Sequence, residues 1–237
     1  YDIYAQRFLI SGTILITSSD NILVGGAGSY SPEDQINPDI AVDEAGGFHV
    51  AWQDHRNGNY DIFATSYISI TGSYTWTLVR RVDDGPNMTQ QVNPTVEVLD
   101  WRRVTGIVYT VAPDPPYMVT VTSVLSQPAR ILVVTWEDDR NGDADIAMAV
   151  SADGGETFDF DQFLTNSSAD GDQMNPDVTL TKDTTTLNFR VPTPIGAVTV
   201  GVEVPVSGIH TVWEGYTTPE NLDRDIYYSQ SQLSASQ

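Results

Sequence analysis

The chain has no cysteine, and only 11 of its 237 residues are Lys or Arg. The lack of cysteine excludes disulfides, thiol catalysis and thiolate metal sites. Because 32 acidic residues give a formal net charge of −21, nucleic acids and anionic membranes are excluded as expected partners. No apolar run approaches the roughly 20 residues of a membrane-spanning helix, and no signal peptide is recognisable. We therefore expect no membrane insertion.

Motifs of known catalytic classes are also missing. There is no Gly-rich phosphate loop, nucleophile elbow, His-Glu-x-x-His motif or Cys/His cluster. The three histidines are dispersed, and two of them, His49 and His210, precede a Trp at matching repeat positions. Packing is therefore favoured over metal ligation for these two residues. No segment keeps a helical period, and the chain is expected to be a non-enzyme.

Two phrases recur along the chain. The first phrase reads Trp52-Gln-Asp54-His-Arg56-Asn-Gly58-Asn-Tyr-Asp61-Ile, then Trp136-Glu-Asp138-Asp-Arg140-Asn-Gly142-Asp-Ala-Asp145-Ile, then Trp213-Glu-Gly215 leading to Asp225-Ile226, and its tail alone is found in Asp2-Ile3-Tyr4-Ala5. The second phrase precedes it as Gln35-Ile-Asn37-Pro38, Gln91-Val-Asn93-Pro94 and Gln173-Met-Asn175-Pro176. Self-similarity at this period indicates stacked or radial repeats.

Each repeat is expected to form four antiparallel strands. Apolar residues alternate with small or polar ones, as in Phe48-His-Val50-Ala-Trp52, which is the period of a half-buried strand. Asn57-Gly58 and Asn141-Gly142 are the favoured pair for a tight hairpin, because both residues tolerate positive φ. The sequence predicts an all-β fold, a β-propeller-type array of about four four-stranded blades, with the terminal blade incomplete or split between the two termini.

The repeat boundaries predict one domain over residues 1–237. Its parts are a partial blade 1–34, a blade 35–90, a blade 91–172 with an inserted hairpin 100–130, and a blade 173–237 with an extension 184–209. The two expansions are expected to stand side by side if the blades are adjacent. A ledge for a partner, an extra sheet layer and longer blades are the alternatives, with structural elaboration favoured.

Aromatic residues divide into two groups. Trp52, Trp136 and Trp213 recur once per repeat, so we predict that they form the core between blades. Trp101 and Tyr117 do not recur and lie on the inserted hairpin. They are therefore the candidates for exposed contact with a glycan or a protein.

The turn of the second repeat is the candidate metal site. Asp139, Asn141, Asp143 and Asp145 place oxygen atoms at alternate positions around Gly142, as calcium-binding loops do. The glutamate that closes an EF-hand loop is missing at the expected spacing. A plain Asn-Gly hairpin stabilised by an Arg–Asp bridge is the favoured alternative, and calcium is the only candidate cofactor.

One turn carries a family resemblance. Ser151-Ala-Asp153-Gly154-Gly155-Glu-Thr157-Phe158 resembles the Asp-box of the sialidase and BNR-repeat propellers, Ser-x-Asp-Gly-x-x-Thr-aromatic. The resemblance implies a propeller fold, with Asp153 bonding turn amides, the glycines allowing a tight backbone and Phe158 packing between blades. In the first repeat the same place reads Thr71-Gly72-Ser-Tyr-Thr75-Trp76, which lacks the aspartate.

The resemblance also raises the question of catalysis. A sialidase of this family needs an arginine cluster, a tyrosine nucleophile with a glutamate partner, and an acid/base aspartate. Arg56 and Arg140 occupy one repeat position, so pairing with Asp54 or Asp61, and with Asp138 or Asp145, is the favoured role. The chain is accordingly expected to be a non-catalytic member or fragment of the family.

The two ends of the chain do not complement each other. The last repeat has three strands, whereas the N-terminus opens on a third strand, residues 1–8, followed by a fourth, residues 12–17. One third strand is thus surplus, and pairing of the terminal hairpin with another copy of the chain is one explanation. The start at Tyr1 in mid-repeat favours a mature or excised segment of a longer protein.

The predicted function follows from these features. Sequons at Asn87 and Asn166 lie in expected loops and are candidate glycosylation sites of an extracellular or cell-surface protein. The prediction is a non-catalytic structural or adhesive surface module that self-assembles head to tail through its terminal strands. A glycan-binding propeller is the alternative, and a sialidase-like glycoside hydrolase is the less favoured one.

Overall fold

The structure is a computed structural model in which residues 1–11, 14–17, 21–25, 31–70, 73–86, 88–165, 171–216 and 224–233 are described. All regular structure in these residues is β, arranged as antiparallel sheets. The all-β prediction is therefore confirmed. Within the described part of the chain there is no helix long and apolar enough to cross a membrane.

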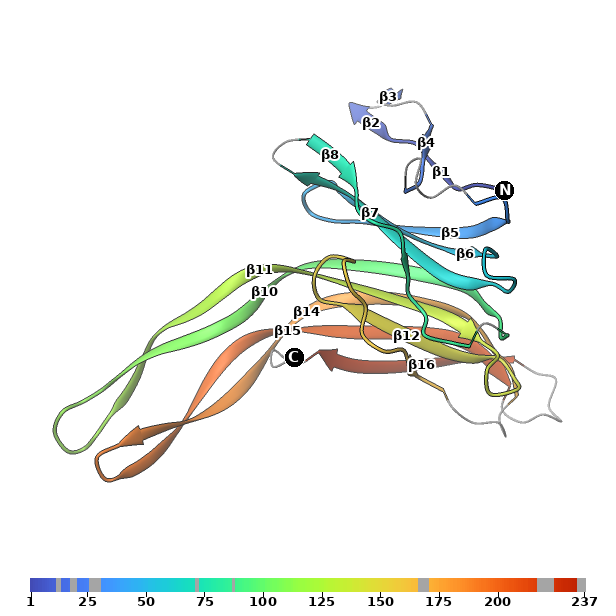
Figure 1. Cartoon of the computed structure of the whole chain (residues 1–237). Helices are drawn as coiled ribbons and strands as arrows, with labels where there is room; N and C mark the ends of the chain where they lie inside the picture. The colour runs from blue at the N-terminus through green and yellow to red at the C-terminus, as the bar shows by residue number, and fades with distance from the viewer. Residues whose placement is uncertain are drawn as a thin grey trace.

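Three sheets correspond to the three repeats (Figure 1). The first sheet consists of β5 (Gln35–Val42), β6 (Phe48–Asp54), β7 (Asp61–Ile70), β8 (Ser73–Trp76) and β9 (Arg80–Arg81). The second sheet consists of β10 (Gln91–Val111), β11 (Val119–Asp138), β12 (Asp145–Ser151) and β13 (Gln162–Phe163). The third sheet consists of β14 (Gln173–Thr193), β15 (Gly196–Tyr216) and β16 (Arg224–Leu233). Each sheet follows chain order, as hairpin-connected strands do, except that β9 pairs with β7.

An N-terminal half-sheet, residues 1–11, 14–17 and 21–25, precedes these three sheets. It holds the pairs β1 (Tyr4–Ala5) with β4 (Ile22–Leu23), and β2 (Phe8–Ser11) with β3 (Ile14–Thr17). Val24 N donates to Ile3 O at 2.9 Å, as Val82 N does to Ile62 O at 2.7 Å in the first sheet. The half-sheet thus reproduces the third and fourth strands of a repeat. The expected single strand over residues 1–8 is divided between β1 and β2.

Turn residues adopt the predicted backbone geometry. Gly58 and Gly142 have φ of 93° and 104°, so the Asn-Gly pairs close hairpins between β6 and β7 and between β11 and β12. The Asn of each Asn-Pro phrase is left-handed, with φ between 50° and 53° at Asn37, Asn93 and Asn175. The first strand of each sheet shifts register at this point. The shift is a β-bulge, which turns the Asn side chain out of the ladder.

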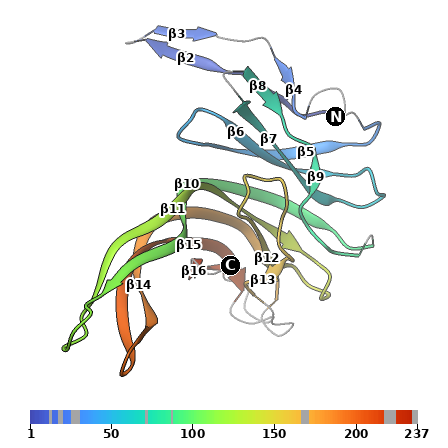
Figure 2. The same cartoon turned by 60° about the vertical axis from the view of Figure 1, so that its left-hand side comes forward.

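The sheets stack face to face, and the core lies between them (Figure 2). One cluster joins the half-sheet to the first sheet around Trp52, and the next joins the first sheet to the second around Trp136. A third cluster, including Ile131 and Ile209, joins the second sheet to the third. Trp52, Trp136 and Trp213 are all buried. The prediction that they form the core between sheets is confirmed for the first two, which belong to these clusters. Among the described residues no strand pairing closes the sheets into a ring.

Two long hairpins project together from the second and third sheets (Figures 1 and 2). We define the first arm as residues 104–126, in β10 and β11, and the second arm as residues 184–206, in β14 and β15. The expected hairpins within 100–130 and 184–209 are thus present, but as continuous extensions of the first two strands of each repeat. The first sheet instead joins β5 to β6 by a short turn, so it carries no arm.

Candidate functional site

A ladder of side chains links successive sheets at the Asn-Pro phrase. Gln53 Oε1 accepts hydrogen bonds from Asn37 Nδ2 at 2.5 Å and from the backbone N of Asn93 at 3.0 Å. Glu137 Oε1 repeats this pattern with Asn93 Nδ2 at 2.9 Å and the backbone N of Asn175 at 2.7 Å. The bulges at Asn93 and Asn175 therefore each present a backbone amide to the acceptor of the preceding sheet. The ladder is a structural joint between repeats.

The repeated arginines pair with buried aspartates, as predicted. Arg56 and Arg140 each donate Nε and Nη2 to the carboxylate of Asp54 and Asp138 respectively, with Nη2 distances of 2.5 Å. Although burial favours the neutral acid, hydrogen bonds from Arg56, Trp52 and Gln35 hold the pKa of Asp54 below its usual value. The bidentate pair occupies the Nε and Nη2 donors of each guanidinium. This geometry favours a structural role over a sialidase-like one.

Arg140 has a second role that the repeat does not give Arg56. It also donates to Asp84 of the segment after the first sheet, at 3.1 Å, and to Asp161 of the second sheet. Burial and a hydrogen bond shared with Asp84 raise the pKa of Asp161 to about 6, against the effect of Arg140. The pKa of Arg140 itself stays above its usual value, because its bonds to the two aspartates outweigh the effect of burial. This cluster ties the first sheet to the second.

A Ser–His–Asp arrangement lies between the first and second sheets. His49 Nδ1 is 2.7 Å from Ser66 Oγ, and His49 Nε2 is 3.3 Å from Asp43 Oδ2. All three side chains are buried, and Ser66 Oγ also donates to Gly154 O at 3.1 Å. Because no substrate reaches the Ser66 hydroxyl in this state, the arrangement lacks the exposed nucleophile that acyl transfer requires. It therefore serves as a buried polar network.

Arg130 of the second sheet completes that network. It lies 2.9 Å from Asp43 and 2.9 Å from Asp100. Burial, followed by the nearby Arg130 charge, lowers the pKa of His49 to about 4 despite the two aspartates. His49 is thus neutral and packed, as the sequence predicts. The sequence did not predict Arg130 and Asp100 near His49, because both lie at the base of the insertion, far from His49 in the chain.

The candidate metal loop is occupied by hydrogen bonds. Asp145 accepts from Asn141 Nδ2 at 2.8 Å and from Thr165 Oγ1 at 3.2 Å, and Asp139 Oδ1 accepts from the backbone N of Gln90 at 2.7 Å. Asp143 is half-buried, and burial raises the pKa of Asp145, with the Asp143 charge adding to it. In the described ranges no three His, Cys, Asp or Glu side chains form a group that could hold a metal ion. Calcium binding here stays a prediction.

The Asp-box-like turn has the expected internal bonding. Asp153 accepts from the backbone N of Thr157 at 2.9 Å and from its Oγ1 at 2.6 Å, and these bonds lower the pKa of Asp153 although burial opposes them. Gly154 and Gly155 have φ of 79° and 93°, and Phe158 packs against the cluster between the first and second sheets. The turn is a structural element that buttresses this interface.

The predicted contact aromatics are not brought together. Trp101 lies at the base of the first arm, opposite Ala129, and is half-buried against the cluster of Ile131. Trp101 is thus only partly exposed, because the strand extension begins while β10 still packs on the third sheet, and its role in ligand contact stays a prediction. Tyr117 lies at the far tip, in the turn after Val111. The sequon residues Asn87 and Asn166 lie outside the described residues.

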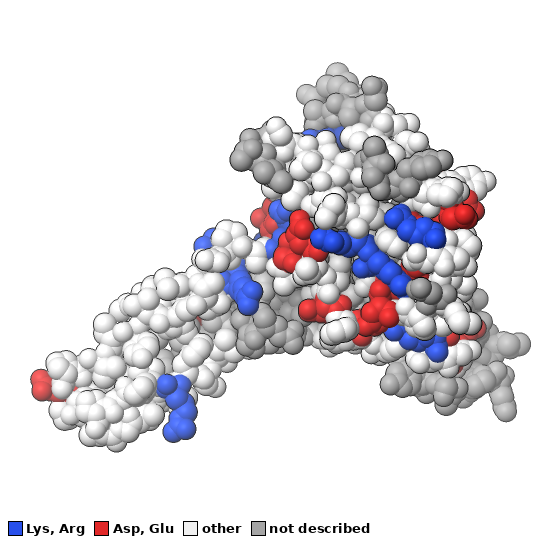
Figure 3. Space-filling view, viewed as in Figure 1, with Lys and Arg blue, Asp and Glu red and all other residues white. Residues whose placement is uncertain are grey.

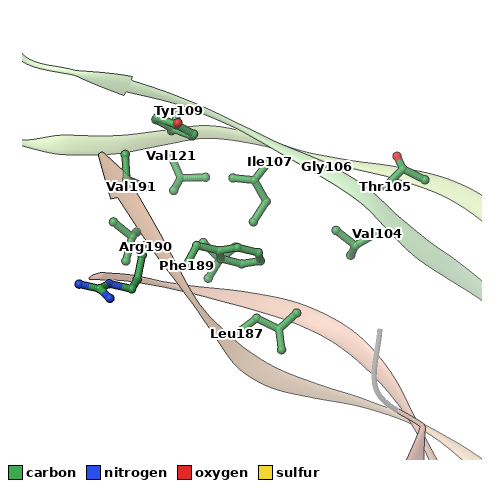
Figure 4. Close-up of a pocket in the computed structure, with 12 residues that line it drawn as sticks. Val104, Thr105, Gly106, Ile107, Tyr109, Val121, Leu187, Phe189, Arg190 and Val191 are labelled. Carbon is green, nitrogen blue, oxygen red and sulfur yellow. The ribbon is translucent and has the colours of Figure 1, made fainter. Parts of the chain in front are cut away.

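An apolar groove lies between the two arms (Figure 4). It has a volume of about 400 Å³. Figure 4 shows Ile107 of the first arm and Phe189 of the second arm pointing toward one another. Most of its other lining residues are aliphatic, and they include Val104, Val121, Leu187, Val191, Val200 and Val202. Sequence reasoning placed the arms side by side but did not predict a groove.

Charge is nearly absent from the arms (Figure 3). Together they hold only Asp114, Arg190 and Glu203, in a chain with a net charge of −21. Charged side chains gather instead over the stacked sheets. Met118 and Ile195, near the two tips, are exposed at 64% and 79%. A mainly apolar surface with few charges on a highly acidic protein is a candidate contact surface.

The comparisons with known proteins give no relative: no protein-family model and no curated protein sequence matches this chain.

Proposed function

We propose that this chain is a non-catalytic structural or adhesive module that works outside the cell, and that the paired arms are its contact surface. The proposed partner is an apolar, uncharged protein segment that lies in the groove between the arms. The observation that carries the proposal is the groove of about 400 Å³ between two arms with three charged residues. Sites that bind apolar partners are generally concave, so that they bury the partner, and they hold few charged residues.

The propeller-type arrangement is part of the same proposal. Contacts of β10 with both β5 and β14 support it, because first strands meet near the axis in stacked blades. A rigid stack of sheets would hold the arms in fixed relative positions. Preorganised arms lose little entropy on binding, which favours a role in adhesion.

The pairing of the repeated arginines and the burial of the Ser66–His49 pair support a non-catalytic role. The repeated arginines are paired with buried aspartates, and Ser66 and His49 are buried. The sialidase-like alternative would need an arginine cluster that the pairing of Arg56 and Arg140 does not leave free.

Binding of the neutral dye Nile red tests whether the groove accepts an apolar ligand. The test variant is Ile107→Ser with Phe189→Ser, and the matched control is Met118→Ser with Ile195→Ser, since neither control residue lines the groove. We expect the test variant to weaken dye binding at least tenfold, because each lost apolar contact contributes about 1.5 kcal/mol or more. The control should bind as the unmodified chain does.

Adhesion is measured with the same variants on a methyl-terminated surface. The groove variant should be retained less than the control, and a screen of chromogenic glycosides should show no turnover. If the groove variant is retained as well as the unmodified chain, the groove is removed from the proposal, and glycoside hydrolysis would overturn the non-catalytic role. Binding to a glycan array that is lost in Tyr117→Ala would favour the glycan-binding alternative instead.

A further inference from the structure

On the outer face of the third sheet, apolar residues are exposed at repeat positions that are buried in the other two sheets. The Ile of the repeated Asp-Ile pair is 0% exposed at Ile62 and at Ile146, whereas Ile226 is 74% exposed. In the first sheet Ile62 belongs to the cluster formed with the second sheet. The third sheet therefore presents at this position an apolar residue that the repeat elsewhere covers with a following sheet.

The next outward position on the same strand gives the same result. Ala64 and Met148 are 3% and 5% exposed, and they pack in the clusters formed with the following sheets. Tyr228 holds this position in the third sheet and is 59% exposed. Its cross-strand partner on β15 is Val212, which is 39% exposed. Three exposed apolar side chains, Val212, Ile226 and Tyr228, thus lie where an inter-sheet contact would be, beside Glu214, the cross-strand partner of Ile226.

The N-terminal half-sheet shows the complementary signature. Ile3, at the position of Ile62, is 7% exposed and packs with Trp52 of the first sheet. Tyr4 is at the position of Phe63 and Ala147, which are 7% and 0% exposed, and Ala147 packs against the preceding sheet. Tyr4 itself is 58% exposed. The face of the half-sheet that would pack against a preceding sheet is therefore exposed to solvent.

We propose that these two faces bind each other between copies of the chain, with the half-sheet of one copy stacked on the third sheet of another. The internal interfaces argue for this occupant: Ile62 and Ala64, on a third strand, form one cluster with Ala147 and Ala149, also on a third strand. The half-sheet supplies a third strand, and the exposed Ile226 and Tyr228 lie on one. The contact is head to tail and does not need the arms.

Such a contact differs from strand pairing at a sheet edge. It uses side-chain faces and repeats the stacking already made three times within the chain, from the half-sheet to the third sheet. Because the contact is heterologous, it leaves one free face of each kind on every dimer, so assembly continues into a filament or a ring. Mutual repulsion of chains with a charge of −21 opposes assembly at low ionic strength.

Sedimentation velocity of the full 237-residue chain tests the proposal, from about 1 μM to about 1 mM in about 0.15 M salt, where surface charges are screened. Two variants each block one face: Ile226→Asp at the third sheet and Tyr4→Asp at the half-sheet. Both residues are exposed, so unchanged melting temperatures are expected. The matched control, Met118→Asp, adds the same charge near an arm tip.

The average mass of the unmodified chain and of Met118→Asp should rise with concentration. Each blocked variant alone should stay monomeric, with at least a tenfold higher Kd. An equimolar mixture of the two blocked variants should form a dimer and nothing larger, since one intact face of each kind remains. A monomeric unmodified chain would overturn the proposal and leave the face to a further repeat or an unrelated partner. Dimers of Tyr4→Asp alone would also overturn it, in favour of symmetric pairing of third sheets.

Discussion

The backbone N of Asn93 donates to Gln53 Oε1 at 3.0 Å, across the boundary between the first and second sheets. Gln53→Ala should lower the free energy of unfolding by about 1–3 kcal/mol, because it leaves the half-buried backbone N of Asn93 without its acceptor, whereas Asn37 Nδ2 keeps its bond to Asn93 Oδ1 at 3.1 Å. Gln53→Glu should cost far less, since Glu137 fills the same place in the second repeat. Urea denaturation at neutral pH measures both values.

The reciprocal change is the control for this ladder. Glu137→Gln should also be tolerated, because the amide oxygen can accept from Asn93 and Asn175 in the same way. An equal loss in Gln53→Glu and Gln53→Ala would show that the position requires the amide group, and that the two repeats are not interchangeable.

Arg140→Ala should destabilise the chain more than Arg56→Ala. Removal of Arg140 leaves Asp138 and Asp161 without their cation, and such changes cost about 3–5 kcal/mol when the partners are buried. Removal of Arg56 takes the cation from a single carboxylate, Asp54, which keeps bonds from Gln35 at 2.7 Å and Trp52 at 3.0 Å. Thermal and urea unfolding compare the two variants.

Ligand binding provides the independent readout for the arginines. Neither substitution should change adhesion of the folded chain, because neither residue touches the groove between the arms. A loss of adhesion at an unchanged melting temperature would assign the arginine a binding role in place of a structural one.

His49 should make the chain less stable as the pH falls from about 6.5 to about 4. Its pKa is lowered to about 4 in the folded protein, from 6.5, so the unfolded chain binds the proton first in this range. Unfolding is then favoured by up to roughly 3 kcal/mol at the acid end. The dependence is fully absent above the unfolded value, where His49 is neutral in both states.

A His49→Gln variant isolates this contribution. Its melting temperature should fall less steeply over the same pH range. Asp161 acts in the opposite direction, because its raised pKa of about 6 makes the folded state bind the proton between about 4 and 6. Asp161→Asn should therefore steepen the acid loss; an unchanged slope in both variants would contradict the assigned pKa directions.

Calcium should raise the melting temperature only modestly. Asp145 already accepts from Asn141 and Thr165, so a cation would have to displace existing hydrogen bonds. Scanning calorimetry with millimolar calcium or with chelator measures the shift, and Asp143→Asn is the matched variant. Loss of the folded signal in chelator would show that metal is essential to the fold.

The repeat itself was predictable because its cause is local. Asn-Gly pairs close the hairpins, alternation sets the buried face, and a Trp recurring once per repeat packs between sheets. The pairing of Arg56 with Asp54 also follows from a spacing of two residues. Such features depend on neighbours in the chain, and sequence reasoning sees them directly.

The candidate site was less predictable because its parts meet only in space. Asp43, His49 and Ser66 come from three different segments of the first sheet, and Arg130 reaches them from the second. Trp101 follows the same rule, since its packing depends on how far the third sheet extends beneath β10. The groove between the arms requires the relative twist of two hairpins, which no residue pattern encodes.

Because both of its faces are buried in the folded protein, the second sheet exposes apolar surface during synthesis and is then prone to aggregation. Residues 131–138 of β11 and 145–151 of β12 are buried without alternation, because sheets cover them from both sides. A ribosome releases this sheet before the third repeat has been made, so one apolar face waits without its cover. The acidic charge of the emerging chain then delays aggregation until the third sheet arrives.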